Sequence, residues 1–353
     1  MAHDGGSVSY VRHIAAAAAG RFFDAERFAS LARSRGCTAL VLNYHLMRTR
    51  SMHEHLAVLE DLFDIVPLDE LVARSREPLQ RGARVPAALT FDDGKRSHLT
   101  EIAPALKQRG HHGTFFVTSD PVATDGIHWF DLADRARHAF DALLAGAGDD
   151  ALREDLRGRF AGLLRARKRD GRAVWCVDFD RWKRMDAARR DASVHELAER
   201  LGIDPRPIDD DERALTPGEV HALVEAGFTV GSHSATHPIL VHEDEERLRR
   251  EIDGSRARIA EWIGEPVRHF CYPNGNANAA TEAATRRAGY ETAWVTEPVW
   301  LGPRENPHRL PRVQIFEHYD RGEIALKALL ATVGALPDPD GTGRAYVQRR
   351  AGR

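Results

Sequence analysis

Cysteine is scarce in this sequence, with only Cys37, Cys176 and Cys271 among 353 residues. An odd number of widely spaced cysteines forms neither a disulfide framework nor a cysteine-ligated zinc site. We therefore expect a reducing compartment and a fold that depends on an ordinary hydrophobic core. A hydrophobic content of 42% and a charged content of 29% allow such a core together with a polar surface.

Long apolar runs and a strong net charge are also missing. No run of about 18 apolar residues is present, so no membrane-spanning helix is predicted. The stretch "HIAAAAAG" near the N-terminus lies between Asp4 and Arg21 and makes a poor secretory signal, so we expect a cytoplasmic protein. The formal net charge of −3 gives no overall attraction to nucleic acid or anionic membranes. No sequence feature specifies an oligomeric state.

Short apolar stretches alternate with amphipathic ones along most of the chain. This alternation predicts βα units built around a parallel sheet, hence an α/β fold. The length would accommodate a barrel of about 250 residues with insertions. The predicted strands are 38–45, 85–91, 113–119, 228–233, 267–273 and 291–296, with a further short strand near residue 65.

The alternation stops between residues 131 and 210, which are rich in Arg, Ala and Asp. We interpret 131–210 as a helical insertion without a large core of its own. The barrel domain is then 38–330, preceded by a helical lead-in at 1–37. The remaining segment, 331–353, is expected to be a mobile, solvated tail.

Three predicted strands end in polar residues: "TFDDG" (90–94), "GSHSATHP" (231–238) and "FCYPNG" (270–275). In a parallel barrel the loops after the strands converge on one mouth, where functional groups gather. These three strand ends are therefore expected to form one site.

His233 and His237 are four residues apart, so they share a face if the segment turns helically. Two imidazoles and one carboxylate form a three-ligand set that leaves a position open for water, as in catalytic metal sites. Such a pair also arises by chance in a chain with 18 histidines. Its position after a strand, with paired aspartates at another strand end, favours the metal site.

Asp92 and Asp93 stand side by side where a strand stops. The simple alternative is a turn, for which Asp-Asp-Gly is well suited. Adjacent side chains on a strand point to opposite faces, so both can enter the mouth only beyond the strand end, where Gly94 permits a bend. One carboxylate could then bind a metal while the other acts as a base. A divalent cation would offset their mutual repulsion.

These motifs resemble those of the polysaccharide deacetylases, carbohydrate esterase family 4, which includes the NodB-type chitooligosaccharide deacetylases. The resemblance covers most of residues 38–320 outside the insertion. It implies a distorted (β/α) barrel that removes acetyl groups from N-acetylated sugars. The segments that carry it are Thr90 to Gly94, His233 to His237, and Tyr272-Pro273-Asn274-Gly275.

Carried over by position, the resemblance implies Asp92 as catalytic base and Asp93, His233 and His237 as metal ligands. The backbone N–H at Asn274 would help to hold the oxyanion. One divalent metal is expected, zinc first, with cobalt, nickel or manganese as alternatives for the same ligands.

The general acid has two candidates. Much of the family uses a histidine in a late Leu-x-x-His motif, and the candidate here is His318 in "IFEH". A branch resembling the poly-N-acetylglucosamine deacetylases uses a Tyr-His pair on an early strand, matched here by Tyr44-His45. We favour His45, because a general acid must lie at the mouth.

The third motif departs from the family pattern. Many relatives carry an arginine there that orients the base, whereas this chain has Cys271. Arg312 in "LPRV" is the predicted substitute partner of Asp92, against the alternative of a solvated loop arginine. Cys271 itself is expected to be a small buried apolar residue.

The expected substrate is an N-acetylated amino sugar or glycoconjugate intermediate, with the insertion shaping the mouth. Trp129, Trp294 and Trp300 lie near predicted loops and are candidates for stacking on a sugar, with core packing as the alternative. Other hydrolase activities remain open: O-acetyl ester cleavage, deformylation, or metal-independent opening of a cyclic amide. From a different class, the chain could be a catalytically silent carbohydrate-binding module.

Overall fold

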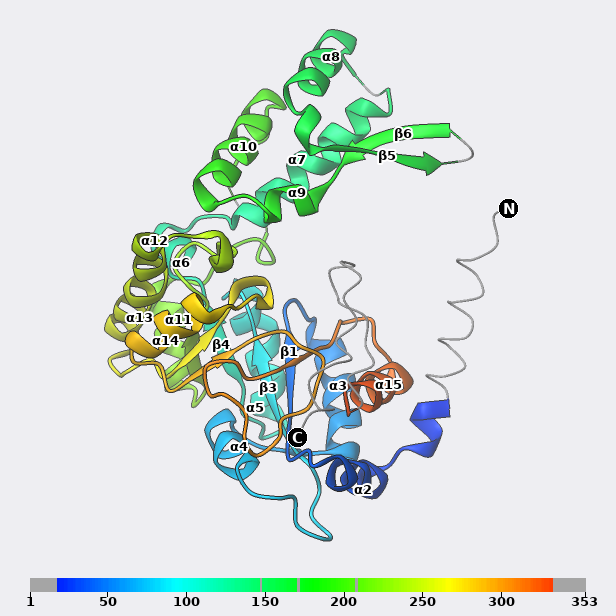
Figure 1. The fold of residues 1–353 in the computed structure, drawn as a ribbon, viewed down its shortest axis with the longest axis vertical. Helices are drawn as coiled ribbons and strands as arrows, with labels where there is room; N and C mark the ends of the chain where they lie inside the picture. The colour runs from blue at the N-terminus through cyan, green and yellow to red at the C-terminus, as the bar shows by residue number, and fades with distance from the viewer. Residues whose placement is uncertain (1–17, 147, 170–171, 207–208, 333–353) are drawn as a thin grey trace.

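The computed structural model describes residues 18–146, 148–169, 172–206 and 209–332 (Figure 1). Residues 1–17 of the predicted lead-in and 333–353 of the predicted tail lie outside the described residues. The described part of the lead-in contains α2 (Ala25–Arg35), which begins at the capping side chain of Asp24 and ends at Gly36 in a left-handed conformation. Within the described ranges, no helix has both the length and the apolar character needed to cross a membrane.

A parallel sheet forms the centre of the molecule. Its strands lie in the order β10-β1-β3-β4-β7-β8-β9, with the short β2 beside β3. After β9, Leu310 bridges Trp294 in parallel, and Val313 of β10 then pairs with Leu42 of β1. Residues 310–313 thus join the last strand to the first and close the sheet into a distorted (β/α) barrel. The strands are β1 (Leu40–Tyr44), β2 (Asp64–Ile65), β3 (Pro86–Phe91), β4 (Thr114–Val117), β7 (Thr229–Ser232), β8 (His269–Cys271), β9 (Thr292–Trp294) and β10 (Val313–Gln314).

The six longer predicted strands are all present and shorter than predicted, most of all β8 and β9, which have three residues each. The two-residue β10 was not predicted, because so short a segment shows no periodicity. Helices and short helical turns cover the outer face of the sheet, where the largest apolar cluster lies. The helices and turns of the barrel domain after α2 are α3 (Thr49–Leu62), α4 (Leu68–Ser75), η1 (His98–Ile102), α5 (Ala103–Gln108), α6 (Ser119–Thr124), α11 (Pro217–Glu225), η3 (Leu240–His242), α12 (Glu245–Arg249), η4 (Arg250–Gly254), α13 (Ser255–Ile263), η5 (Pro273–Gly275), α14 (Ala279–Arg287) and α15 (Arg321–Thr332).

The barrel interior is narrow and filled by side chains of alternate strand residues. Because successive side chains of a strand point to opposite faces, the inward positions of β3 carry Ala88 and Thr90, and Asp92 follows them. A Cβ added to Gly231 of β7 would lie 2.5 Å from the Phe116 ring, so that inward position has no room for a side chain. The buried apolar residues around Ala88 and Phe116 form a cluster that consists of Ala39, Val41, Val66, Leu68, Leu71, Ala88, Phe116, Cys271, Trp294, Leu301 and Leu310.

The segment predicted as a helical insertion forms a separate lobe beside the barrel (Figure 1). The prediction of a helical insertion without a large core of its own needs correction, because the lobe also contains strands and a buried apolar core. It contains an antiparallel hairpin, and its helices and hairpin enclose their own cluster of buried apolar residues, including Leu132, Phe140 and Trp182. Its elements are α7 (Trp129–Leu144), α8 (Asp150–Arg159), η2 (Ala161–Leu163), β5 (Leu164–Arg169), β6 (Arg172–Val177), α9 (Phe179–Lys183) and α10 (Ala187–Arg200).

Candidate active site

The side chains of the adjacent Asp92 and Asp93, at the end of β3, point in different directions. Asp92 continues the inward row of β3, and its N–H bonds to the Tyr44 carbonyl at 3.0 Å. The chain then turns sharply, with Asp93 at φ 82° and Gly94 at φ 70°. A left-handed aspartate is uncommon and turns its carboxylate away from the course of the strand. The bend therefore begins at Asp93 itself, one residue before the predicted glycine.

Asp92 is held by Arg312. The arginine Nη1 and Nη2 atoms donate to the two carboxylate oxygens of Asp92, each at 2.7 Å, and Nη1 also donates to Thr90 Oγ1 at 3.0 Å. Arg312 is fully buried and Asp92 is 2% exposed. Burial alone would raise the pKa of Asp92, but the Arg312 charge and hydrogen bonds hold that pKa well below its usual range. Asp92 is therefore an ionised, oriented carboxylate.

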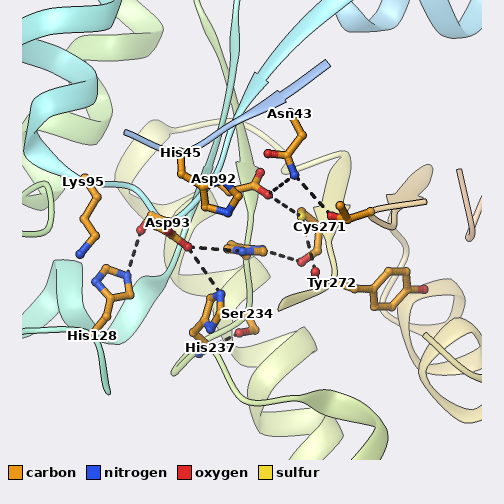
Figure 2. A network of polar contacts seen from close by, with 12 residues as sticks. Asn43, His45, Asp92, Asp93, Lys95, His128, Ser234, His237, Cys271 and Tyr272 are labelled. Carbon is orange, nitrogen blue, oxygen red and sulfur yellow. Dashed lines mark hydrogen bonds and ion pairs between the residues drawn. The ribbon is translucent and has the colours of Figure 1, made fainter. Parts of the chain in front are cut away.

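Asn43 and Cys271 complete the surroundings of Asp92 (Figure 2). Asn43 Nδ2 donates to Asp92 Oδ2 at 3.1 Å, and the Cys271 thiol lies 3.5 Å from the same oxygen. Arg312 Nη2 is 2.8 Å from Cys271 Sγ, so the arginine passes through the space that the small cysteine leaves. Cys271 is fully buried, as expected. Sequence reasoning missed Asn43, although its inward position on β1 was a usable signal.

Asp93, His233 and His237 converge on one point. The Asp93 Oδ1 atom lies 3.6 Å from His233 Nε2 and 3.5 Å from His237 Nε2. One ligand atom from each residue lies within 4.8 Å of the others, and all three residues are buried. His233 Nδ1 bonds to the Cys271 carbonyl at 2.9 Å, which orients its ring. The structure thus brings together the three residues that the sequence singled out.

The donor set suits a divalent metal. Asp93 Oδ1 is buried without a hydrogen-bond partner, which would be costly unless a cation meets it. Burial lowers the pKa of His233, and it lowers that of His237 well below the usual value. Both imidazoles are therefore neutral, the form in which histidine binds a metal. One carboxylate and two neutral imidazoles match a three-ligand catalytic site.

A second group of possible ligands consists of Asp92, His233 and Cys271. It fits a metal less well, because Asp92 already pairs with Arg312 through both oxygens. Burial raises the pKa of the Cys271 thiol well above its usual value, whereas a metal binds the thiolate. The group containing Asp93 is therefore the better metal site.

Left-handed backbone is concentrated at these strand ends. Among the described residues, five that are not glycine have positive φ, and Asp93, Ser234, His237 and Asn274 are four of them. Such conformations cost of order 1–3 kcal/mol each and persist where the surrounding contacts impose them. Here the contacts are visible: His237 N–H donates to Ser234 Oγ at 3.0 Å, and Glu251 accepts hydrogen bonds from Ala235 N–H and Thr236 N–H.

The two candidates for the general acid lie in different surroundings. Tyr44 pairs with Phe91 across β1 and β3, so the next residues, His45 and Asp92, end neighbouring strands side by side (Figure 2). His45 is partly exposed there. His318 is exposed after β10, and its ring stacks on Phe316 with centroids 5.8 Å apart.

Asn274 lies in the turn η5 that follows β8, at φ 57°. The turn is closed by a hydrogen bond from Gly275 N–H to the Tyr272 carbonyl at 2.8 Å. A Cβ on Gly275 would lie 2.5 Å from Thr296, so the turn packs tightly against the segment after β9. This packing fixes the third strand end beside Asp92 and His233.

Two tryptophans considered for sugar stacking are core residues, and that expectation was wrong for them. Trp294 and Trp300 are both fully buried. Trp294 Nε1 donates to Thr292 Oγ1 at 2.8 Å, and Trp300 Nε1 donates to the Ala328 carbonyl at 2.9 Å. Trp129 is 7% exposed, and its indole N–H points to the His237 carbonyl. None of the three presents an open ring face to a ligand.

In the segment His128 to Asp131, sequence reasoning singled out only Trp129 and missed the contacts that its neighbours make with the site. His128 Nε2 bonds to the Asp93 carbonyl at 3.1 Å, and buried Lys95 forms an ion pair with Asp131. Burial raises the pKa of Asp131 to about 6. The only signal in the sequence is a dense run of His, Trp and Phe, which by itself is ordinary core chemistry.

An α/β barrel with carboxylates and imidazoles gathered at its strand ends has its functional groups where barrel enzymes carry their active sites. The family model "Polysaccharide deacetylase" matches residues 81–142 and 172–293, more than half of the chain. The chain belongs to the polysaccharide deacetylase family and is a deacetylase. The family implies a carbohydrate substrate, and its members generally use a divalent metal. No curated protein sequence matches the chain.

Solved structures confirm the fold. The deacetylase PplD of Streptococcus pyogenes, in complex with acetate, superposes with a TM-score of 0.52 at 12% identity, covering 82% of this chain and 97% of that one. IcaB from Ammonifex degensii gives a TM-score of 0.50 at 17% identity, covering 83% of this chain and 97% of that one. At these identities the likeness establishes the barrel architecture alone.

Proposed function

We propose that this chain removes the N-acetyl group from an N-acetylated amino sugar or glycoconjugate intermediate in a metal-dependent hydrolysis. The observation that carries the proposal is the different surroundings of two adjacent aspartates. Asp92 is ionised and paired with Arg312, while Asp93 has a buried, unpartnered oxygen that faces His233 and His237.

Asp93, His233 and His237 would hold the metal, for which zinc suits the ligand set best. A divalent metal in this position would polarise an amide carbonyl and lower the pKa of water from about 15.7 toward 7. His233 keeps its ring orientation through the Cys271 carbonyl. Asp93 is fixed by its own left-handed backbone and by His128 on its carbonyl.

Asp92 would accept the proton of the attacking water. Arg312 and Asn43 together keep the carboxylate ionised and direct it toward the mouth. The low pKa of Asp92 makes it a weak base in the free protein, so proton transfer depends on placement rather than on basicity. The backbone N–H of Asn274 would donate to the developing oxyanion.

His45 would donate the proton that lets the amine leave. Its place beside Asp92, at the end of the neighbouring strand, puts an acid and a base at the same mouth. A positioned general acid contributes about 10²–10⁴ in rate. Together these residues account for each proton transfer of amide hydrolysis.

The proposal is tested by metal content and acetate release in wild type, Asp92→Asn, Asp93→Ala and His237→Ala. We expect about one metal per chain in wild type and Asp92→Asn, and loss of metal from the other two. Only wild type should release acetate from N-acetylated sugars such as chitooligosaccharides. Wild type that stays metal-free after reconstitution would overturn the ligand assignment. Metal-replete wild type that binds glycan without turnover would indicate a binding module.

A further inference from the structure

The inserted lobe reaches one of the proposed metal ligands directly. Trp129, at the start of α7, donates its indole N–H to the His237 carbonyl at 2.8 Å. Arg190 of α10 approaches the same carbonyl, with Nη1 at 3.5 Å. We infer that Trp129 and Arg190 are positioning residues for the metal site, acting through the backbone of His237. This inference rests on the proposed metal-binding role of His237.

His237 is a residue whose position needs support. It adopts φ 57°, a conformation that residues with side chains seldom take without restraint. On its amino side, its N–H is held by Ser234, which is itself left-handed. On its carboxyl side, the carbonyl is held by the insertion. Hydrogen bonds therefore hold the left-handed turn at both its N–H and its carbonyl, and the bond to the carbonyl comes from outside the barrel.

Trp129 and Arg190 pack against each other. Arg190 is fully buried, and its guanidinium carbon lies 4.1 Å from the centroid of the Trp129 ring. Arg190 Nε donates to Asp191 Oδ1 at 2.8 Å, which fixes the plane of the guanidinium. The start of α10 is tied to the barrel as well, because Ala187 N–H donates to Glu243 Oε1 at 2.8 Å.

Neighbouring residues of the same segment contact the rest of the site. The Phe130 ring meets the His237 imidazole edge-on, with centroids 4.9 Å apart. His128 bonds to the carbonyl of Asp93 (Figure 2). Asp131 pairs with buried Lys95, which lies two residues after Asp93. Four consecutive residues where the chain enters the lobe, His128 to Asp131, thus contact the loops of two proposed metal ligands.

The lobe therefore has a role beyond shaping the mouth. It has an apolar core of its own, and Trp129 and Arg190 present hydrogen-bond donors to the His237 carbonyl. Groups that orient metal ligands typically change metal affinity 10- to 100-fold when they are removed. In this chain we assign that function to the insertion.

The test compares Trp129→Phe with Trp182→Phe. Trp182 is a matched control, because it is fully buried in the same lobe and donates its indole N–H to Ser193 Oγ at 3.0 Å, inside the lobe core. Both substitutions keep an aromatic ring and remove one N–H donor. The full chain is stripped of metal and titrated with Zn²⁺ against a chelating competitor, and the Co²⁺ form is examined by visible absorption.

We expect Trp129→Phe to weaken Zn²⁺ binding roughly 10- to 100-fold and to alter the Co²⁺ spectrum. Trp182→Phe should retain both properties of wild type, even if it lowers thermal stability. Arg190→Gln removes the other donor to the His237 carbonyl, and it serves as the test of the inference if Trp129→Phe does not fold. If both Trp129→Phe and Arg190→Gln keep the Zn²⁺ affinity and the Co²⁺ spectrum of wild type, this inference is overturned and the proposed function is not. A wild type that binds no metal would overturn the proposed function instead.

Discussion

Arg312 and Asp92 are 220 residues apart in the chain and form a two-point ion pair inside the barrel, with both N–O distances at 2.7 Å. The pair exists because residues 310–313 close the sheet between β9 and β1. This closing segment therefore carries the side chain that keeps the proposed base ionised.

Replacing Arg312 with Met should remove the charge and the hydrogen bonds that keep Asp92 ionised and oriented. The change leaves a buried carboxylate without its partner, so we expect a loss of about 3–5 kcal/mol in the free energy of unfolding. We also expect kcat to fall roughly 100-fold as Asp92 loses its orientation. Adding Asp92→Asn to Arg312→Met should recover stability without recovering activity, measured by urea unfolding and acetate release.

Arg268 provides the control for this ion pair, because in its contact with Asp69 the two side chains are 44% and 36% exposed. Arg268→Met should change stability by less than about 1 kcal/mol. Equal destabilisation by the two substitutions would contradict the importance assigned to the buried pair.

His45 and His318 can be distinguished by a leaving-group test. His45→Asn should lower kcat/KM on an N-acetyl sugar by about 10²–10⁴, because the leaving amine must be protonated. An aryl acetate, whose leaving group needs no proton, should be hydrolysed nearly as fast as by wild type. His318→Asn should match wild type on both substrates. The reverse pattern, with His318 essential for amide cleavage, would exclude His45 as the acid.

The buried histidines should make the metal-free protein sensitive to acid. Burial lowers the pKa of His98 to about 4, whereas an unfolded histidine titrates near 6.5. The unfolded state thus binds more protons between these values, so the stability that His98 contributes is present above pH 6.5 and is lost as pH falls toward 4. From pH 7.5 to 5.5 the loss is about 1.4 kcal/mol.

His98→Gln should remove this part of the pH dependence, because glutamine does not titrate. Urea unfolding of the metal-free protein at pH 7.5 and 5.5 measures the effect, with exposed His195→Gln as the control. An unchanged pH dependence in His98→Gln would show that the pKa of His98 is not lowered in the folded state.

Gly94 should be required both for its left-handed backbone and because a side chain there would clash with Val117. A Cβ at Gly94 would lie 2.9 Å from the Val117 Cβ, whereas at Gly82, also at positive φ, it would meet open space. Gly82→Ala should therefore cost about 1–2 kcal/mol from backbone strain alone. Gly94→Ala should add about 1–3 kcal/mol from overpacking and weaken Zn²⁺ binding through Asp93. Equal losses of stability in urea unfolding would contradict the steric argument.

The sequence alone was enough to predict the α/β class, the main strands and the residues at three strand ends. These features depend on local periodicity and on short motifs, which are properties of neighbouring residues. The family resemblance extended them to a distorted barrel and a deacetylase. The pairing of Arg312 with Asp92 was also predicted, because the resemblance implies an arginine that orients the base and this chain has Cys271 at the usual place of that arginine.

Tertiary structure alone decided which side chains surround these motifs. Trp294 and Trp300 turned out to be core residues, because composition does not reveal which face of a strand or loop a tryptophan occupies. The core of the insertion depends on a hairpin packed on helices, a long-range arrangement without a local signature. The contact of Trp129 with the His237 carbonyl joins residues 108 positions apart through a backbone atom, which no side-chain motif encodes.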